Sequence, residues 1–384
     1  MKLDIRGWMA AALVSLGAAS PLAHAQPAGV TIGLTLSTTG PGASLGIPER
    51  NAFELLPDTL GGLPVRYVVL DDATDPGAAS RNARRLVQEH RVDAIVGSST
   101  TPATLAVTAV AAESGTLQIA LSPFRPAPEV FDWVLSLPQS IPVMSSALFD
   151  DMKAHGVKTL GFIGFADSYG EVWLNDVRPR AKEAGIELVA VERYARTDSS
   201  VTAQTLKLAA TRPDAVLVVA SGTPGALPMV ALRDRGYAGR IYQTHGVANN
   251  DFLRVAGKSA EGAVIPAGAL LVAEQLPAAH PSKEAAGSFV RRYEARHGAG
   301  SRDLFAGYAW DAYLILDEAV PMAARKARPG TAEFRTALRD AVMATRGLAA
   351  SHGVINVAPE AHSAYGEDGR VLVTVEEGKW KLMP

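Results

Sequence analysis

Short apolar runs alternate with longer segments of helical period, and this alternation constrains the fold more than any other feature of the sequence. Between the apolar runs lie segments with apolar residues three and four positions apart, the pattern of a helix that covers a core. A βαβαβ order requires a parallel sheet with helices on both faces. Strands are predicted over residues 32–36, 65–70, 92–96 and 117–121, with helices over 49–56, 77–89 and the segment after Ser98.

The same alternation begins again further along the chain, after a proline-dotted segment over residues 122–142. Helical segments follow Gly262, and the chain closes with a strand-rich tail over 369–382. We therefore expect an α/β protein with two lobes, each built on a doubly wound parallel sheet. The second group has strands over 158–162, 186–191, 214–219 and 240–243, helices over 171–184 and 201–211, and later helices over 281–297 and 305–319.

The first residues are typical of a secretory signal peptide. Lys2 and Arg6 precede an uncharged stretch over residues 8–19, and Ala23-His24-Ala25 offers small residues at a cleavage position. We expect residues 1–25 to be removed after Ala25, the alternative being an N-terminal membrane anchor. The chain of 384 residues contains no cysteine, so neither disulfides nor thiolate metal sites are expected.

The formal net charge of −2 gives no basic surface for nucleic acid or for an anionic membrane, which leaves a small solute as the expected partner. The glycine-rich, phosphate-loop, nucleophile-elbow and zinc-protease motifs of α/β enzymes do not occur in the sequence. No residue set pairs a nucleophile with a base. The protein is therefore not expected to be an enzyme or to hold a cofactor or metal.

Four consecutive hydroxyl residues, Ser98 to Thr101, follow the predicted strand over 92–96 and precede Pro102. Ligands of parallel α/β sheets bind beyond the carboxyl ends of the strands, where this run lies. The amides of the first helical turn and the helix dipole favour an anion there. Two interpretations stay open: the run binds a carboxylate, or it only caps the helix.

Three other features of the sequence each have two possible roles, one in binding and one in structure. Asp71, Asp72 and Asp75 could hold a cation, although such clusters after a strand more often form turns and caps. His245 ends a strand at the same edge as the hydroxyl run, so it either faces a ligand or is structural. Tyr169 lies between a strand end and a helix start, where a phenol can contact a ligand.

Together, several stretches resemble the periplasmic solute-binding proteins of branched-chain amino acid ABC importers, which have the type I periplasmic binding protein fold. They are GLTLSTTGPGASLG, VLDDATDPGAASRNARRLV, IVGSSTTPATLAVTAVAAESG, ADSYGEVW and HGVANNDFLRVAGKSAEG, in the family's order. The resemblance implies lobes that close on a ligand about three crossovers, near 131–136, 266–270 and 352–353. It places the N-terminal lobe at 28–134 and 268–351, and the C-terminal lobe at 135–267 and 352–384.

The resemblance also implies a ligand site. It puts the carboxylate contacts on Ser99, Thr100 and the adjacent Thr101, and the remaining ligand contacts on Leu45, Phe124, Tyr169, Thr223 and His245. Phe124 replaces a small residue, and Thr223 lies where the family has a second tyrosine. His245 replaces the family's glutamate, and an imidazole cannot serve as the partner of a ligand ammonium group as a carboxylate does.

These departures favour an aromatic or aliphatic acid over a branched-chain amino acid. We expect a monomeric periplasmic binding protein that delivers a small, partly apolar carboxylate to an inner-membrane ABC permease. An extracellular sensing domain of a signalling system and, less favoured, an α/β enzyme are the alternatives. Fusion to a kinase or cyclase would favour the sensor, and turnover of a bound acid would favour the enzyme.

Overall fold

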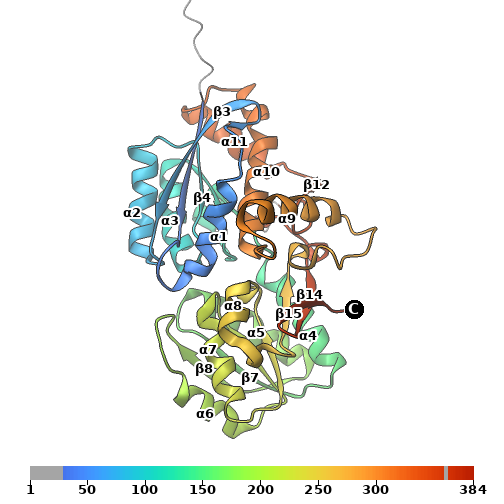
Figure 1. Ribbon diagram of the computed structural model, residues 1–384. Helices are drawn as coiled ribbons and strands as arrows, with labels where there is room; N and C mark the ends of the chain where they lie inside the picture. Colours follow the sequence, from blue (N-terminus) through green and yellow to red (C-terminus); the bar gives the residue numbers. More distant parts are fainter. Residues whose placement is uncertain (1–28, 359–361) are drawn as a thin grey trace, which may run out of the picture.

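The computed structural model describes residues 29–358 and 362–384, and the chain forms two lobes, each built around its own sheet (Figure 1). The predicted signal peptide and its cleavage position lie outside the described residues. Within the described part of the chain, no helix is both long and apolar enough to span a membrane.

The first sheet has six strands in the order β2-β3-β1-β4-β5-β6. All its pairs are parallel except β2 with β3. Every residue of β4 and β5 is buried, as expected for strands covered on both faces. The strands are β1 (Val30–Leu36), β2 (Thr59–Leu60), β3 (Leu63–Asp71), β4 (Ala94–Gly97), β5 (Leu117–Ala120) and β6 (Val134–Ser136).

Helices from two distant parts of the chain cover this sheet (Figure 1). α2 and α3 pack together on one side, whereas α1 packs against α10, which in turn contacts α11. Trp310 of α10 is buried against Phe289 of α9, so the predicted helix stripe over 305–319 is a core face. The helices are α1 (Ala43–Phe53), α2 (Pro76–Gln88), α3 (Thr101–Ser114), α9 (Lys283–His297), α10 (Leu304–Ala324) and α11 (Ala332–Met343).

The second sheet has seven strands in the order β15-β14-β11-β10-β9-β7-β8. Strands β7 to β11 are parallel, and the C-terminal hairpin of β14 and β15 adds antiparallel strands at one edge. Its strands are β7 (Thr159–Phe165), β8 (Glu187–Tyr194), β9 (Ala215–Val219), β10 (Arg240–Gln243), β11 (Val264–Ala267), β14 (Val371–Glu376) and β15 (Lys379–Leu382).

All helices of the second lobe except the first connect its parallel strands, as the predicted alternation requires. A short hairpin of β12 (Leu348–Ala349) and β13 (Val354–Ile355) lies apart from both sheets. The helices are α4 (Ile141–Ala154), α5 (Ser168–Ala184), α6 (Thr202–Thr211), α7 (Ala226–Arg233) and α8 (Asn250–Ala256).

The chain passes between the two lobes at three places: after Ser136, after Ala267, and between β13 and β14. These places are near the three predicted crossover stretches. The predicted fold class, two α/β lobes of the type I periplasmic binding protein fold, is confirmed. The exact lobe boundaries stay a prediction.

Candidate functional site

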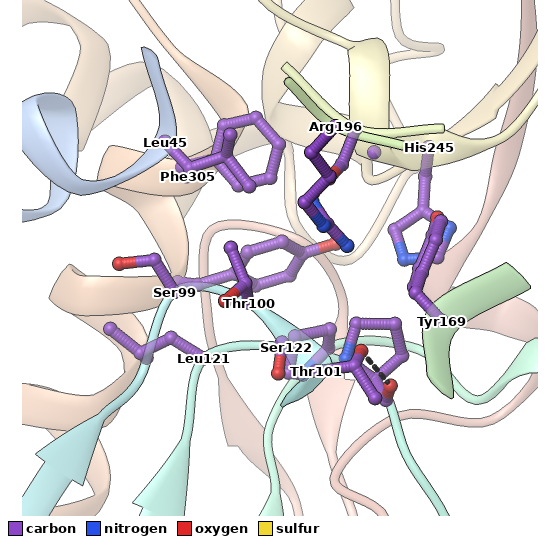
Figure 2. Close-up of a pocket in the computed structure, with 15 residues that line it drawn as sticks. Leu45, Ser99, Thr100, Thr101, Leu121, Ser122, Tyr169, Arg196, His245 and Phe305 are labelled. Carbon is purple, nitrogen blue, oxygen red and sulfur yellow. Dashed lines mark hydrogen bonds between the residues drawn. The ribbon is translucent and has the colours of Figure 1, made fainter. Parts of the chain in front are cut away.

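A small cavity lies between the lobes, where the carboxyl ends of both sheets come together (Figure 2). The lobes touch beside it, because Thr223 N donates to Ser44 Oγ at 3.2 Å and Asn249 Nδ2 donates to Ser44 O at 3.3 Å. The residues that line it are Leu45, Ser99–Thr101, Leu121–Pro123, Pro138, Tyr169, Arg196, Ser221, His245, Gly246, Phe305 and Tyr308.

The four hydroxyls of the predicted run have different partners. Ser98 Oγ donates to Asp72 at 2.7 Å, Ser99 Oγ is hydrogen-bonded to the carboxyl group of Glu49, and Thr101 Oγ1 donates to the carbonyl of Pro123 at 2.9 Å. Thr100 stands at the N-cap of α3, but its side chain makes no capping bond. Its Oγ1 is buried and has no hydrogen-bond partner among the described residues.

The capping interpretation of the run is wrong, because the Thr100 side chain makes no capping bond, whereas carboxylate binding by the run stays a prediction. Three of the four hydroxyl groups are hydrogen-bonded to first-lobe residues. Thr100 is the member whose hydroxyl has no hydrogen-bond partner among the described residues, and it stands at the beginning of a helix whose first amides and dipole favour an anion.

Arg196 is absent from the sequence-predicted site residues. It lies in the turn after β8 and brings a positive charge to the cavity. Its Nε donates to Asp167 Oδ2 at 2.6 Å and its Nη1 to Ser221 Oγ at 2.8 Å, while its guanidinium carbon lies 4.1 Å from the centre of the Phe165 ring. Its Nη2 is buried with no partner among the described residues. In Figure 2 the side chain extends into the cavity, between Leu45 and Phe305 on one side and His245 on the other.

His245 faces the same cavity from the beginning of the turn after β10, and its side chain is almost completely buried. Both ring nitrogens lack a hydrogen-bond partner among the described residues. Burial lowers the pKa of His245 to about 4, because the charged imidazolium loses its hydration. The ring is therefore neutral at pH 7 and presents one donor and one acceptor.

Tyr169 contributes its ring rather than its proton. Its hydroxyl donates to Thr244 Oγ1 at 2.8 Å, and Thr244 in turn donates to the carbonyl of Ala220 at 2.7 Å. The phenol therefore forms part of the wall of the second lobe. Apolar surface is supplied from the first lobe by Leu45 and Phe305.

Among the described residues that line the cavity, the only fully charged side chain is positive. Arg196 is a cation, and of the described residues that line the cavity none is an aspartate or a glutamate. Arg196 forms an ion pair with Asp167. Asp167 also caps α5 by accepting from Tyr169 N and Gly170 N. The cavity thus offers cationic and neutral donors but no carboxylate.

Six of the eight sequence-predicted site residues line the cavity, namely Leu45, Ser99, Thr100, Thr101, Tyr169 and His245. Phe124 instead packs against Ala120 and Val134 and borders a separate hollow with Phe131 and Val172. Thr223 is not among the lining residues, and its amide contacts Ser44 across the lobe interface. At that strand end Ser221 lines the cavity.

The three aspartates of the predicted cluster serve as hydrogen-bond acceptors for protein donors. Asp75 caps α2 by accepting from Ala78 N at 2.6 Å. Asp71 accepts from the backbone and hydroxyl of Thr39, and Asp72 accepts from Ser98. This is the turn and cap chemistry that the sequence analysis gave as the commoner alternative. Within the described residues, no group of three potential metal ligands comes together.

Comparison with known proteins identifies the class. The chain matches the periplasmic binding protein family over residues 29–366 and belongs to that family. An amino acid binding protein of Pseudomonas aeruginosa is 27% identical over 67% of this chain and 70% of its own length. The Leu/Ile/Val-binding protein BraC3 of Rhizobium johnstonii is 25% identical over 67% of this chain and 71% of its own length.

Among solved structures, an extracellular ligand-binding receptor from Rhodopseudomonas palustris HaA2 has 46% sequence identity and a TM-score of 0.91, covering 92% of this chain and 99% of its own. The relatives and the fold are those of solute-binding proteins and not of enzymes. Membership in the family also implies a periplasmic location.

Proposed function

We propose that this protein is the substrate-binding component of an ABC importer, and that it captures a small, partly apolar carboxylate in the cavity between its lobes. The ligand would touch both lobes and so stabilise the closed arrangement, after which an inner-membrane permease would receive it. The protein acts by capture and closure without a reaction.

The observation that carries this proposal is the Nη2 of Arg196, a residue that lines the cavity, because this atom is buried without a partner among the described residues. A buried donor on a charged group is costly to leave unpaired, so a ligand acceptor is expected there. A carboxylate satisfies it by a charge-assisted hydrogen bond. Thr100 Oγ1 supplies a further free donor from the opposite lobe.

The same lining argues against a zwitterionic amino acid. A ligand ammonium group would enter a cavity with a guanidinium, a neutral imidazole and no lining carboxylate among the described residues. Burying a charge without a partner is strongly unfavourable. The apolar body of the ligand is expected to lie against Leu45 and Phe305.

A pair of ligands with the same apolar body tests the proposal. Isocaproate is leucine without its ammonium group, and benzoate is a small aromatic acid. A true ligand at a hundredfold excess over its dissociation constant adds about 2.7 kcal/mol to the free energy of unfolding. Thermal denaturation should show stabilisation by isocaproate or benzoate and not by leucine. Stabilisation by leucine alone, or by none of the acids, would contradict the proposal.

We also infer that the chain is exported by residues 1–25, cleaved after Ala25, and acts as a monomer. N-terminal sequencing of the exported protein should then begin at Gln26. Size-exclusion chromatography with light scattering should give the mass of one chain, and a dimer would contradict the inference.

A further inference from the structure

A buried glutamate lies directly behind the cavity wall. Glu49 of α1 has no exposed surface, and its Oε2 is hydrogen-bonded to the hydroxyl of Ser99, which lines the cavity. Its Oε1 has no hydrogen-bond partner among the described residues. Among the described residues, the Ser99 hydroxyl is the one side-chain group bonded to this carboxyl group, and it also accepts from Ser37 N at 2.9 Å.

The protonation state of Glu49 decides what Ser99 offers to a ligand. A serine hydroxyl has one proton and two lone pairs. If Glu49 is ionised, the Ser99 hydroxyl donates its hydrogen bond to the Glu49 carboxylate. The Ser99 oxygen then has only a lone pair to present to the cavity, and this lone pair repels a ligand carboxylate. If Glu49 is protonated, it donates to Ser99 Oγ, and the Ser99 proton is free to turn toward the ligand.

The surroundings favour the protonated form. Burial raises the pKa of Glu49 well above its ordinary value, and the nearby carboxyl groups of Asp72 and Asp303 raise it further, while the hydrogen bond from Ser99 opposes the shift. Asp72 faces it from the turn after β3, and Asp303 faces it from the N-cap of α10. Burial also raises the pKa of Asp303 to about 8. Both titratable groups that act on Glu49 among the described residues are thus acids.

We propose that Glu49 is a positioning residue that carries a proton and turns the Ser99 hydroxyl into a donor for the ligand carboxylate. This inference rests on the proposed function for the identity of the ligand, but the proton on Glu49 is a property of the free protein. The two can therefore be tested separately.

Infrared spectroscopy of the ligand-free protein tests the proton. The difference spectrum between wild type and Glu49→Gln should contain the carbonyl stretch of a protonated carboxylic acid at neutral pH. Ser99→Ala removes the hydrogen-bond partner, so it should shift the frequency of that band. Carboxylate bands in place of the acid band would overturn the proposal, whether or not any ligand has been found.

Isocaproate binding at a series of pH values tests the consequence. The affinity of wild type should fall about tenfold for each pH unit above the pKa of Glu49, because binding requires one proton there. Glu49→Gln, whose amide still donates to Ser99, should match wild type at low pH and lose this dependence. Asp93→Asn is the control, because Asp93 is a buried acid of the same lobe that accepts from Thr31 N and Gly330 N, outside the cavity.

The control should keep the pH profile of wild type. A Glu49→Gln profile that stays as steep as that of wild type would refute the role of Glu49, although isocaproate would still be a ligand. Failure of isocaproate and benzoate to bind wild type at any pH would refute the proposed function instead. The infrared result would then decide the state of Glu49 by itself.

Discussion

Replacing Arg196 by glutamine removes the positive charge from the cavity and leaves the fold of the second lobe in place. Asp167 loses its ion pair, but it continues to accept from Tyr169 N at 2.9 Å and Gly170 N at 3.3 Å. A hydrogen bond to a charged group contributes about 1.5 to 3 kcal/mol. The loss of one such bond to the ligand carboxylate therefore weakens binding about 10- to 150-fold.

Isothermal titration calorimetry with the best acid among isocaproate and benzoate measures this change. Arg193→Gln is the matched control, because Arg193 lies three residues before Arg196, near the end of β8, is exposed, and pairs with Glu171 away from the cavity. It should bind like wild type. A dissociation constant for Arg196→Gln within twofold of wild type, with the melting temperature unchanged, would refute the role given to the guanidinium group.

Two further predictions concern closure and stability. Gly222→Ala should weaken ligand binding about tenfold by opposing closure, because a Cβ there would lie 2.7 Å from Ser44 Oγ and 2.8 Å from Leu45 Cδ1. Calorimetry of Gly236→Ala, which has a similar positive φ but open space around it, should show unchanged affinity, and equal losses in both variants would exclude the closure explanation. Burial lowers the pKa of His352 to about 3, below its unfolded value of about 6.5, so stability from this group is lost as pH falls through 6.5. Between about pH 7.5 and 5, urea denaturation should show wild type losing about 2 kcal/mol more than His352→Gln, and equal slopes would contradict the assignment.

Much of the fold could be predicted because the alternation of strand and helix patterns is strong. The predicted strand over 240–243 coincides with β10, and the predicted helix over 77–89 differs from α2 by one residue at each end. Short or interrupted elements were harder to predict. β6 has three residues, and β11 contains Pro266, so neither offers a pattern long enough to recognise. α1 begins at Ala43, ahead of the predicted start at Glu49, and includes Pro48.

The site was predictable where it depends on strand ends. Residues that directly follow a parallel strand gather at one edge of a sheet, and this placed Ser99, Thr100 and His245 near one another. Arg196 could have been selected by the same rule, but β8 continues to Tyr194, past the predicted strand end at 191. Phe305 was assigned to a core stripe, and only the packing of α10 beside α1 shows that it also borders the cavity.

Hydrogen-bond partners could not be read from the sequence. The hydroxyl run gives no sign that Ser99 is bonded to Glu49 or that Thr101 is bonded to Pro123, because these partners come from other elements. Which hydroxyl remains free depends on the positions of those acceptors. For the same reason the charge of the cavity depends on Arg196, whose position relative to Asp167 is set by tertiary structure.

A crystal structure of the protein with isocaproate, or with benzoate if that acid binds more tightly, tests the central claim most directly. We predict a carboxylate oxygen within hydrogen-bonding distance of Arg196 Nη2 and of Thr100 Oγ1, with the apolar body against Leu45 and Phe305. An acid bound outside the cavity between the lobes, or bound there with its carboxylate directed away from Arg196, would contradict it.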